Sequence, residues 1–203
     1  MKKTKRKKRA ALLCLSIGLA LILAALALIL YNRWDANRAY EASEEVAAQL
    51  VEEIPVGGEQ NRGQDPEWNP YREPEAIEVD GNGYIGILEI PSINLVLPVM
   101  DQWDYTRLKI AACRYTGSYL TNDMVIAGHN YLRHFSPIKR LKPGSDVYFT
   151  SVAGRVFHYQ VVSLETLKPT QIEDMITGDW DLNMFTCNPG GQTRMAVRCA
   201  AVS

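Results

Sequence analysis

Residues 182–198 read LNMFTCNPGGQTRMAVR. The first six residues are mostly apolar, which is typical of a buried strand. The Asn-Pro-Gly-Gly that follows is a turn signal, because proline and glycine take backbone angles that interrupt a strand. The last five residues again have the composition of a strand. We therefore expect two neighbouring strands joined by a short turn, which returns Arg194 to the end of the strand that carries Cys187.

Short β-rich runs between turn signals recur through the second half of the chain. Seven or eight such strands, with only brief helical inserts, favour a mainly β domain built as a closed or nearly closed barrel. We expect short helices at residues 134–141 and 171–176. The expected strands are residues 84–90, 95–100, 123–127, 146–150, 156–163, 182–186 and 194–202.

The opening of the sequence predicts a membrane anchor. Seven basic residues lie before residue 10, and residues 10–31 form an uncharged, almost wholly apolar run of 22. As a helix this run spans about 33 Å, enough to cross the hydrocarbon core of a bilayer. A cleaved signal peptide is the alternative, because Ala25-Leu26-Ala27 resembles a cleavage site. The apolar region of such a peptide is usually only about 7–15 residues long, which favours a retained helix.

The charge distribution predicts the orientation of this helix. The basic residues 1–9 are expected to stay in the cytoplasm by the positive-inside rule, which places everything after Tyr31 outside the cell membrane. The remainder of the chain is acidic in balance. A basic cluster that directly precedes a membrane span does not predict nucleic-acid binding, so we expect no nucleic-acid partner.

Two segments separate the predicted membrane helix from the β domain. Residues 32–53 are rich in Ala and Glu, with apolar residues at roughly helical spacing, and predict an amphipathic helical stalk. Residues 54–76 are rich in Pro and Gly, which predicts a linker or a lid. The folded domain is then expected to occupy residues 77–203.

Two residues at the ends of predicted strands could carry chemistry. Cys187 ends an apolar strand before a turn, where a rigid element can present a side chain to a cleft. His129 follows Gly128 at the end of another strand, and histidine is suited to share a proton with a thiol near neutral pH. Either residue, taken alone, could instead be structural.

Cys14 lies in the predicted membrane helix, which leaves an odd number of cysteines outside the membrane. At least one thiol is therefore free or paired with another chain.

Arg194 opens the last predicted strand, seven residues after Cys187. A planar guanidinium beside the thiol could hold a carbonyl oxygen or an oxyanion. Arg198 points to the same strand face, because side chains alternate along a strand, and it competes with Arg194 for this role. No spacing of metal ligands can be assigned in the sequence, and we expect no metal site and no cofactor.

Taken together and in this order, several stretches between residues 83 and 201 resemble the sortase family. Residues that follow the histidine stretch, from Phe135 to Gly144, also have the family's spacing. Asn183 and Met184 depart from the family, which prefers Thr and Leu there. The resembling stretches are IGILEIPSIN (85–94), LPV (97–99), VIAGHN (125–130), FTC (185–187) and TRMAVR (193–198).

The resemblance implies a sortase-like eight-stranded β-barrel and a cysteine transpeptidase. Cys187 would attack the Thr–Gly-type bond of an LPXTG-like sorting signal and form a thioacyl enzyme. His129 would transfer protons, and Arg194 would stabilise the oxyanion. Thr186 and Asn130, which stand next to Cys187 and His129 in the motifs, are expected to bind the substrate. The expected partners are secreted proteins with a C-terminal sorting signal and an amine acceptor on a cell-wall precursor or a pilin.

Asp65 and Trp68 in the linker are candidates for a lid. The stretch DPEW (65–68) resembles the Asp-Pro-aromatic lid of some pilus-building sortases, although Glu67 separates the proline from the ring. Such a lid would place Asp65 near Arg194 and Trp68 over Cys187. The same composition is that of a solvated spacer, which is the competing interpretation.

Two other functions are compatible with the residues alone. A papain-like or L,D-transpeptidase enzyme of the cell wall also uses a cysteine and a histidine, but in another order or closer together in sequence. A membrane-tethered binding or structural module would leave Cys187 inert, and would need neither His129 nor Arg194 beside it. Reaction of the thiol with a sorting-peptide analogue separates these alternatives.

Overall fold

The computed structural model describes residues 2–55, 69 and 71–202, and the chain forms two compact units that divide after Arg38. Helix α1 (Lys2–Glu53) makes up the first unit and contributes its last turns to the second. Its apolar part lies within Ala11–Glu53, reaches a mean hydropathy of 2.9 and is unburied. Helix α1 is therefore long and apolar enough to cross a membrane, which suggests a single-pass anchor.

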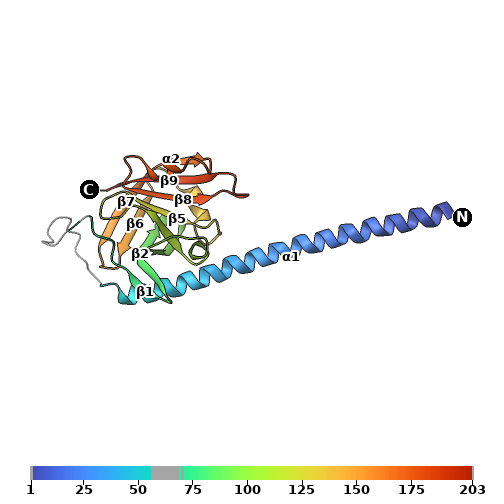
Figure 1. Cartoon of the computed structure of the whole chain (residues 1–203), viewed down its shortest axis with the longest axis horizontal. Helices are drawn as coiled ribbons and strands as arrows, with labels where there is room; N and C mark the ends of the chain where they lie inside the picture. Colours follow the sequence, from blue (N-terminus) through green and yellow to red (C-terminus); the bar gives the residue numbers. More distant parts are fainter. Residues whose placement is uncertain (1, 56–68, 70, 203) are drawn as a thin grey trace. The chain divides into compact units, whose positions relative to one another are not determined.

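The second unit is built around a closed β-barrel (Figure 1). Strand β2 pairs with β3 on one side and with β6 on the other, so strands β2 to β9 close into the eight-stranded barrel that the sequence predicts. Strand β1 extends the sheet from the start of β2. The sheet order is β1-β2-β3-β4-β5-β8-β9-β7-β6. Within the described residues the strands are β1 (Ile77–Val79), β2 (Asn82–Ile90), β3 (Leu95–Met100), β4 (Ala112–Thr116), β5 (Met124–Gly128), β6 (Asp146–Ser151), β7 (Val156–Leu167), β8 (Leu182–Cys187) and β9 (Arg194–Ala201).

Within the described residues, β1 and β4 are the strands that the sequence patterns do not predict. Strand β4 is short and reads ACRYT, without the alternation of apolar and polar residues that marks a half-buried strand. Within the expected helix 134–141, only Ser136–Arg140 is helical, as a 3₁₀ helix with a proline in its first turn. The short helices are η1 (Pro91–Ile93), η2 (Arg107–Lys109), η3 (Ser136–Arg140) and α2 (Ile172–Ile176).

The barrel interior holds the main hydrophobic core, and β8 shows how the sheet divides inside from outside. Leu182 and Met184 are buried in the interior cluster, whereas Phe185 packs in a separate cluster with residues of helix α2. Because side chains alternate along a strand, Cys187 shares the outer face with Phe185. Further members of the interior cluster are Ile85, Leu88, Ile90, Val99, Phe149, Tyr159 and Val197.

The end of helix α1 covers part of the outer barrel surface. Its buried residues recur at helical spacing and therefore lie on one face. Leu50 packs in a cluster with Tyr84, Met100 and Cys113, all of which are buried. The last turns of α1 are thus an integral part of the second unit. The buried residues of this face are Ala39, Ser43, Val46, Ala47 and Leu50, followed by Ile54.

Replacement of Leu50 by Ala should lower the free energy of unfolding of the second unit by about 2–5 kcal/mol, because it leaves a cavity at a fully buried site. The matched control is Val51→Ala on the same turn. Val51 is 60% exposed, and its replacement should change the stability by less than about 0.5 kcal/mol. Urea unfolding followed by tryptophan fluorescence measures both. Equal losses for the two variants would contradict the packing of α1 on the barrel.

Candidate active site

Three neighbouring strands bring the predicted residues to one edge of the barrel. Strands β5 and β8 run parallel with Gly128 opposite Thr186, at a strand spacing of about 4.8 Å. His129 and Cys187 each come next along these two strands. Strands β8 and β9 run antiparallel, with Cys187 directly opposite Arg194. Opposite residues of an antiparallel pair lie on the same face, so Cys187 and Arg194 are side by side.

Cys187 differs from the other cysteines in its exposure. All four thiols are free, but Cys113 and Cys199 are fully buried, whereas Cys187 is half-buried. Burial raises the pKa of both buried thiols to about 12, which keeps them protonated at neutral pH and poor nucleophiles. Cys14 is exposed but lies in the apolar part of α1. Cys187 is therefore the accessible thiol of the second unit.

His129 opens a tightly wound loop of residues 129–136, which we name the histidine loop. The His129 carbonyl accepts hydrogen bonds from the N–H of Tyr131 at 2.8 Å and from that of Phe135 at 3.2 Å. The His129 ring stacks on that of Tyr131, with centroids 4.0 Å apart. A Cβ on Gly128 would lie 2.1 Å from the Phe135 ring, so this close packing requires glycine. These contacts fix the backbone from which the imidazole projects.

Arg194 is held by the turn that precedes it. The Asn188 amide donates to the Thr193 hydroxyl at 2.7 Å, and the Asn188 N–H donates to the Thr193 carbonyl at 2.9 Å. Gly190 and Gly191 take φ angles of 82° and 70°, which cost glycine little. Nη1 of Arg194 donates to the carbonyls of Gly191 at 3.0 Å and Thr193 at 3.3 Å. The turn between β8 and β9 therefore orients the guanidinium.

Arg198, the competitor of Arg194, has a different environment. It is 2% exposed, and its Nη2 donates to the Glu165 carboxylate at 3.2 Å and to the carbonyl of Asp174. Its Nη1 donates to the Met175 carbonyl at 3.3 Å. Asp174 and Met175 lie in helix α2, so Arg198 fastens this helix to the barrel. Arg194, and not Arg198, therefore lies beside the Cys187 thiol.

The chain is also similar to proteins of one family. A family model for the sortase domain matches residues 88–202, which is more than half of the chain. The chain belongs to the sortase family. Sortases are cysteine transpeptidases, and this protein is therefore a member of that enzyme class.

Solved structures of sortases share the fold. Sortase C1 of Streptococcus agalactiae is 25% identical with a TM-score of 0.56, and the match covers 70% of this chain and 79% of that one. Sortase C1 of Streptococcus suis is also 25% identical, with a TM-score of 0.52 and coverage of 59% and 73%. Sortase A of Corynebacterium diphtheriae, at 20% identity and a TM-score of 0.56, covers 83% and 84% and shows the fold alone. None of the curated protein sequences matches this sortase.

Lys139 is a candidate functional residue of this sortase that no sequence pattern indicates. It lies half-buried in η3, and its Nζ donates to Oδ1 of Asn130 at 2.5 Å. Burial lowers the pKa of the Lys139 ammonium, and attraction to the Cys187 sulfur opposes that shift. Lys139 and Cys187 are therefore coupled electrostatically. The contact depends on packing between distant segments, which a local pattern does not reveal.

The two expected substrate-binding residues have different surroundings. Thr186 is 1% exposed, and its hydroxyl donates to the Gly128 carbonyl at 2.8 Å. This hydroxyl ties β8 to β5 and does not face solvent. Asn130 is half-buried at the start of the histidine loop, where it accepts the hydrogen bond from Lys139. Of the two, only Asn130 has a partly exposed side chain.

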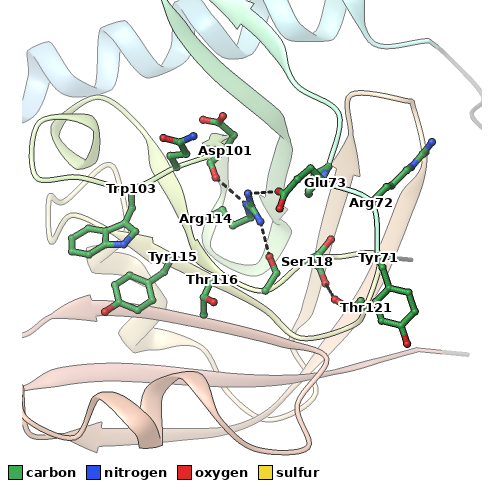
Figure 2. A pocket seen from close by; sticks show the side chains of 13 residues that line it. Tyr71, Arg72, Glu73, Asp101, Trp103, Arg114, Tyr115, Thr116, Ser118 and Thr121 are labelled. Atoms are coloured by element: carbon green, nitrogen blue, oxygen red, sulfur yellow. Dashed lines mark hydrogen bonds and ion pairs between the residues drawn. The ribbon is translucent and has the colours of Figure 1, made fainter. Parts of the chain in front are cut away.

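An aromatic path leads from β8 to a surface pocket. Phe185, two residues before Cys187, meets Tyr115 edge-on, with ring centroids 5.2 Å apart. Tyr115 in turn lies against Trp103, with centroids 4.8 Å apart. Figure 2 shows these two rings together on one side of a cavity of about 550 Å³. The cavity thus has an apolar wall on the side that connects to the strand of the thiol.

Arg114 lies at the centre of this pocket and holds its walls together (Figure 2). Its Nε donates to the Asp101 carbonyl at 2.9 Å, and its Nη1 donates to the Gly117 carbonyl at 3.1 Å. Its Nη2 pairs with the Glu73 carboxylate at 3.0 Å, which ties the chain just before β1 to β4. The Glu73 side chain is 85% exposed, so this ion pair contributes only about 0–1 kcal/mol.

Asp65 and Trp68, the expected lid residues, lie outside the described residues. Residues 71–74, which begin three residues after Trp68, line the pocket around Arg114. Across residues 2–55, 69 and 71–202, no group of three or more His, Cys, Asp or Glu side chains is arranged to hold a metal ion.

Near neutral pH, iodoacetamide should label Cys187 in the folded full-length protein and leave Cys113 and Cys199 unmodified. The reason is that burial keeps the latter two thiols protonated and out of reach. Peptide mass spectrometry measures the extent of modification at each site. The same protein in urea is the control, in which all three should react. Labelling of Cys113 or Cys199 as fast as Cys187 in the folded protein would show that the burial argument is wrong.

Proposed function

We propose that this sortase cleaves an LPXTG-like sorting signal with Cys187 and passes the acyl group to an amine. The observation that carries the proposal is the position of Cys187 directly opposite Arg194, with the strand of His129 on the other side of β8. A nucleophile, a group for proton transfer and an oxyanion donor are then available at one barrel edge.

The first step is acylation of the thiol. The Cys187 thiolate attacks the carbonyl carbon of the scissile bond, and an electron pair moves onto the carbonyl oxygen to form a tetrahedral oxyanion. The Arg194 guanidinium donates hydrogen bonds to that oxygen. When the C–N bond breaks, the imidazolium of His129 gives its proton to the leaving amine. The product is a thioester on Cys187.

The second step is transfer to the acceptor. The incoming amine attacks the thioester carbonyl, and neutral His129 takes the proton that the amine loses. The C–S bond then breaks, which restores the Cys187 thiolate and releases the new amide. One amide bond is exchanged for another, so the reaction requires no oxidant, reductant or cofactor.

The aromatic path supports binding of an extended peptide on the acyl side of the scissile bond. Phe185 and Cys187 are about 7 Å apart along β8. The ring-to-ring steps to Tyr115 and Trp103 add 5.2 and 4.8 Å. The whole path is roughly 17 Å, the length of about five extended residues. Four residues of such a motif lie on the acyl side of the Thr–Gly-type bond and span about 14 Å, so they reach most of the way from the thiol to the pocket beside Trp103.

In this proposal the enzyme acts outside the cell membrane. The apolar part of α1 anchors it, and the basic residues 1–9 stay in the cytoplasm by the positive-inside rule. The catalytic unit then meets secreted proteins that bear a C-terminal sorting signal. The acceptor amine comes from a cell-wall precursor or from a pilin lysine. Both substrates lie on the side of the membrane where the barrel is placed.

Trapping with a modified peptide tests the proposal. A sorting peptide that carries a thiol-reactive group in place of the scissile amide should add its mass to Cys187 alone. Cys187→Ala should abolish trapping, cleavage and transfer, whereas Cys113→Ala and Cys199→Ala should keep most activity because those thiols are buried. Mass spectrometry and peptide cleavage assays measure these outcomes. Activity that survives in Cys187→Ala would exclude the proposed nucleophile.

Arg194→Ala should lower turnover by about 10²–10³, the usual effect of removing an oxyanion donor. Arg194→Lys should not restore it, because an ammonium lacks the planar fork. Arg198→Ala should instead lower the melting temperature, because it leaves the α2 carbonyls and Glu165 without their buried donor. Kinetics of peptide cleavage and thermal unfolding measure the two effects. A folded Arg198→Ala with crippled turnover, beside a nearly normal Arg194→Ala, would reverse the assignment.

A further inference from the structure

Helix α1 contacts the loop that carries His129. Tyr40 lies in the part of α1 that belongs to the second unit, and its ring centre is 3.5 Å from the guanidinium carbon of Arg133. A guanidinium over an aromatic face at this distance is a cation–π contact. Arg133 is otherwise exposed and lies in the histidine loop, four residues after His129. The helix therefore contacts the histidine loop at Arg133.

His134, the next residue of the histidine loop, makes a second contact outside the loop. His134 is 1% exposed, and its Nε2 lies 3.4 Å from the Ile110 carbonyl oxygen. Burial lowers the pKa of His134 to about 4, so the ring is neutral near pH 7. Ile110 packs against the cluster that contains Leu50 of α1. Arg133 and His134 thus both connect the loop to α1 or to the cluster that α1 covers.

Short contacts inside the histidine loop link these anchors to the imidazole. The rings of His134 and Tyr131 meet edge-on with centroids 6.4 Å apart, and Tyr131 stacks on His129. The Tyr131 carbonyl accepts the N–H of His134 and that of Ser136, each at 3.1 Å. A shift of the loop at Arg133 therefore moves Tyr131, and with it the ring of His129.

We infer that the Tyr40–Arg133 contact is a positioning device for His129, so that the helix leading from the anchor is part of the catalytic apparatus. The inference rests on the proposed proton-transfer role of His129. Tyr40 and Arg133 act through the loop and are positioning residues. Loss of the contact leaves the aromatic path and the thiol in place but displaces the imidazole. The effect therefore falls on kcat and leaves KM unchanged.

The experiment uses the full-length protein in detergent micelles and a fluorogenic sorting peptide. Tyr40→Leu and Arg133→Gln should each lower kcat by about two- to fivefold, the range of an exposed cation–π contact. Tyr40→Phe keeps the aromatic face and should retain the kcat of the unmodified enzyme. The double variant Tyr40→Leu/Arg133→Gln should be no slower than either single variant, because both remove the same contact.

Arg38→Gln is the matched control. Arg38 lies over the ring of Trp34 at 5.5 Å on the same helix, but both residues belong to the first unit. This variant removes another cation–π contact of α1, together with the Arg38–Asp35 ion pair at 3.4 Å, without changing the Tyr40–Arg133 contact, and should keep its kcat. A loss of kcat in Arg38→Gln equal to that in Arg133→Gln would overturn the inference.

Two further outcomes would also overturn it. One is an additive loss in the double variant, and the other is a loss in Tyr40→Phe as large as in Tyr40→Leu. If Tyr40→Leu melts early, Arg133→Gln carries the test alone, because Arg133 is exposed and its replacement leaves the core intact. His129→Ala distinguishes failure of the proposed function from failure of the positioning role. Activity in His129→Ala would refute the proposed function. An inactive His129→Ala, with normal kcat in Tyr40→Leu and Arg133→Gln, would refute the positioning role alone.

Discussion

The parallel pairing of β5 with β8 is the constraint on which the site depends. No turn joins these strands, because the chain completes β6, β7 and α2 between them. Their register brings His129 and Cys187 to the same barrel edge, and a slip of one residue would turn every side chain of β8 to the other face. The Thr186 hydroxyl, bonded to the Gly128 carbonyl where the ladder ends, adds a fixed point for this register. The position of the thiol relative to the histidine is thus a property of the whole barrel.

Arg194 reaches the same edge by a local route. The β8–β9 connection is a short turn held by the Asn188 and Thr193 hydrogen bonds, so its geometry forms wherever the hairpin forms. The two strands also carry Phe185 opposite Ala196 on the outer face, and helix α2 packs there. The Arg198 guanidinium holds α2 in place by donating hydrogen bonds to carbonyl oxygens of that helix. The outer surface next to the thiol therefore consists of a local hairpin and a helix held by one buried cation.

The sequence predicts most of the barrel because its strands are short, β-rich and separated by turn signals. The sequence does not predict strand β4. This strand forms because it pairs with β3 and β5, and its own residues lack the alternation of apolar and polar side chains. Period-two alternation places Arg194 and Arg198 on one face but cannot tell them apart. What distinguishes them is that α2 covers only Arg198, a fact of tertiary packing. The lid residues lie outside the described residues, so the lid stays a prediction.

The segment from Ala39 to Glu53 has an apolar face, which the sequence indicates by the helical spacing of its apolar residues but whose partner it does not identify. Ala39, Ser43 and Ala47 are small and contribute little hydrophobicity to that face. The same small side chains allow the helix axis to lie close to the barrel, where Leu50 fills the gap. The barrel surface beneath is apolar, and α1 covers it. A chain that began at Ile77 would expose that surface to water and lose its hydrophobic stabilisation. The end of the helix that carries the anchor therefore also completes the hydrophobic packing of the second unit.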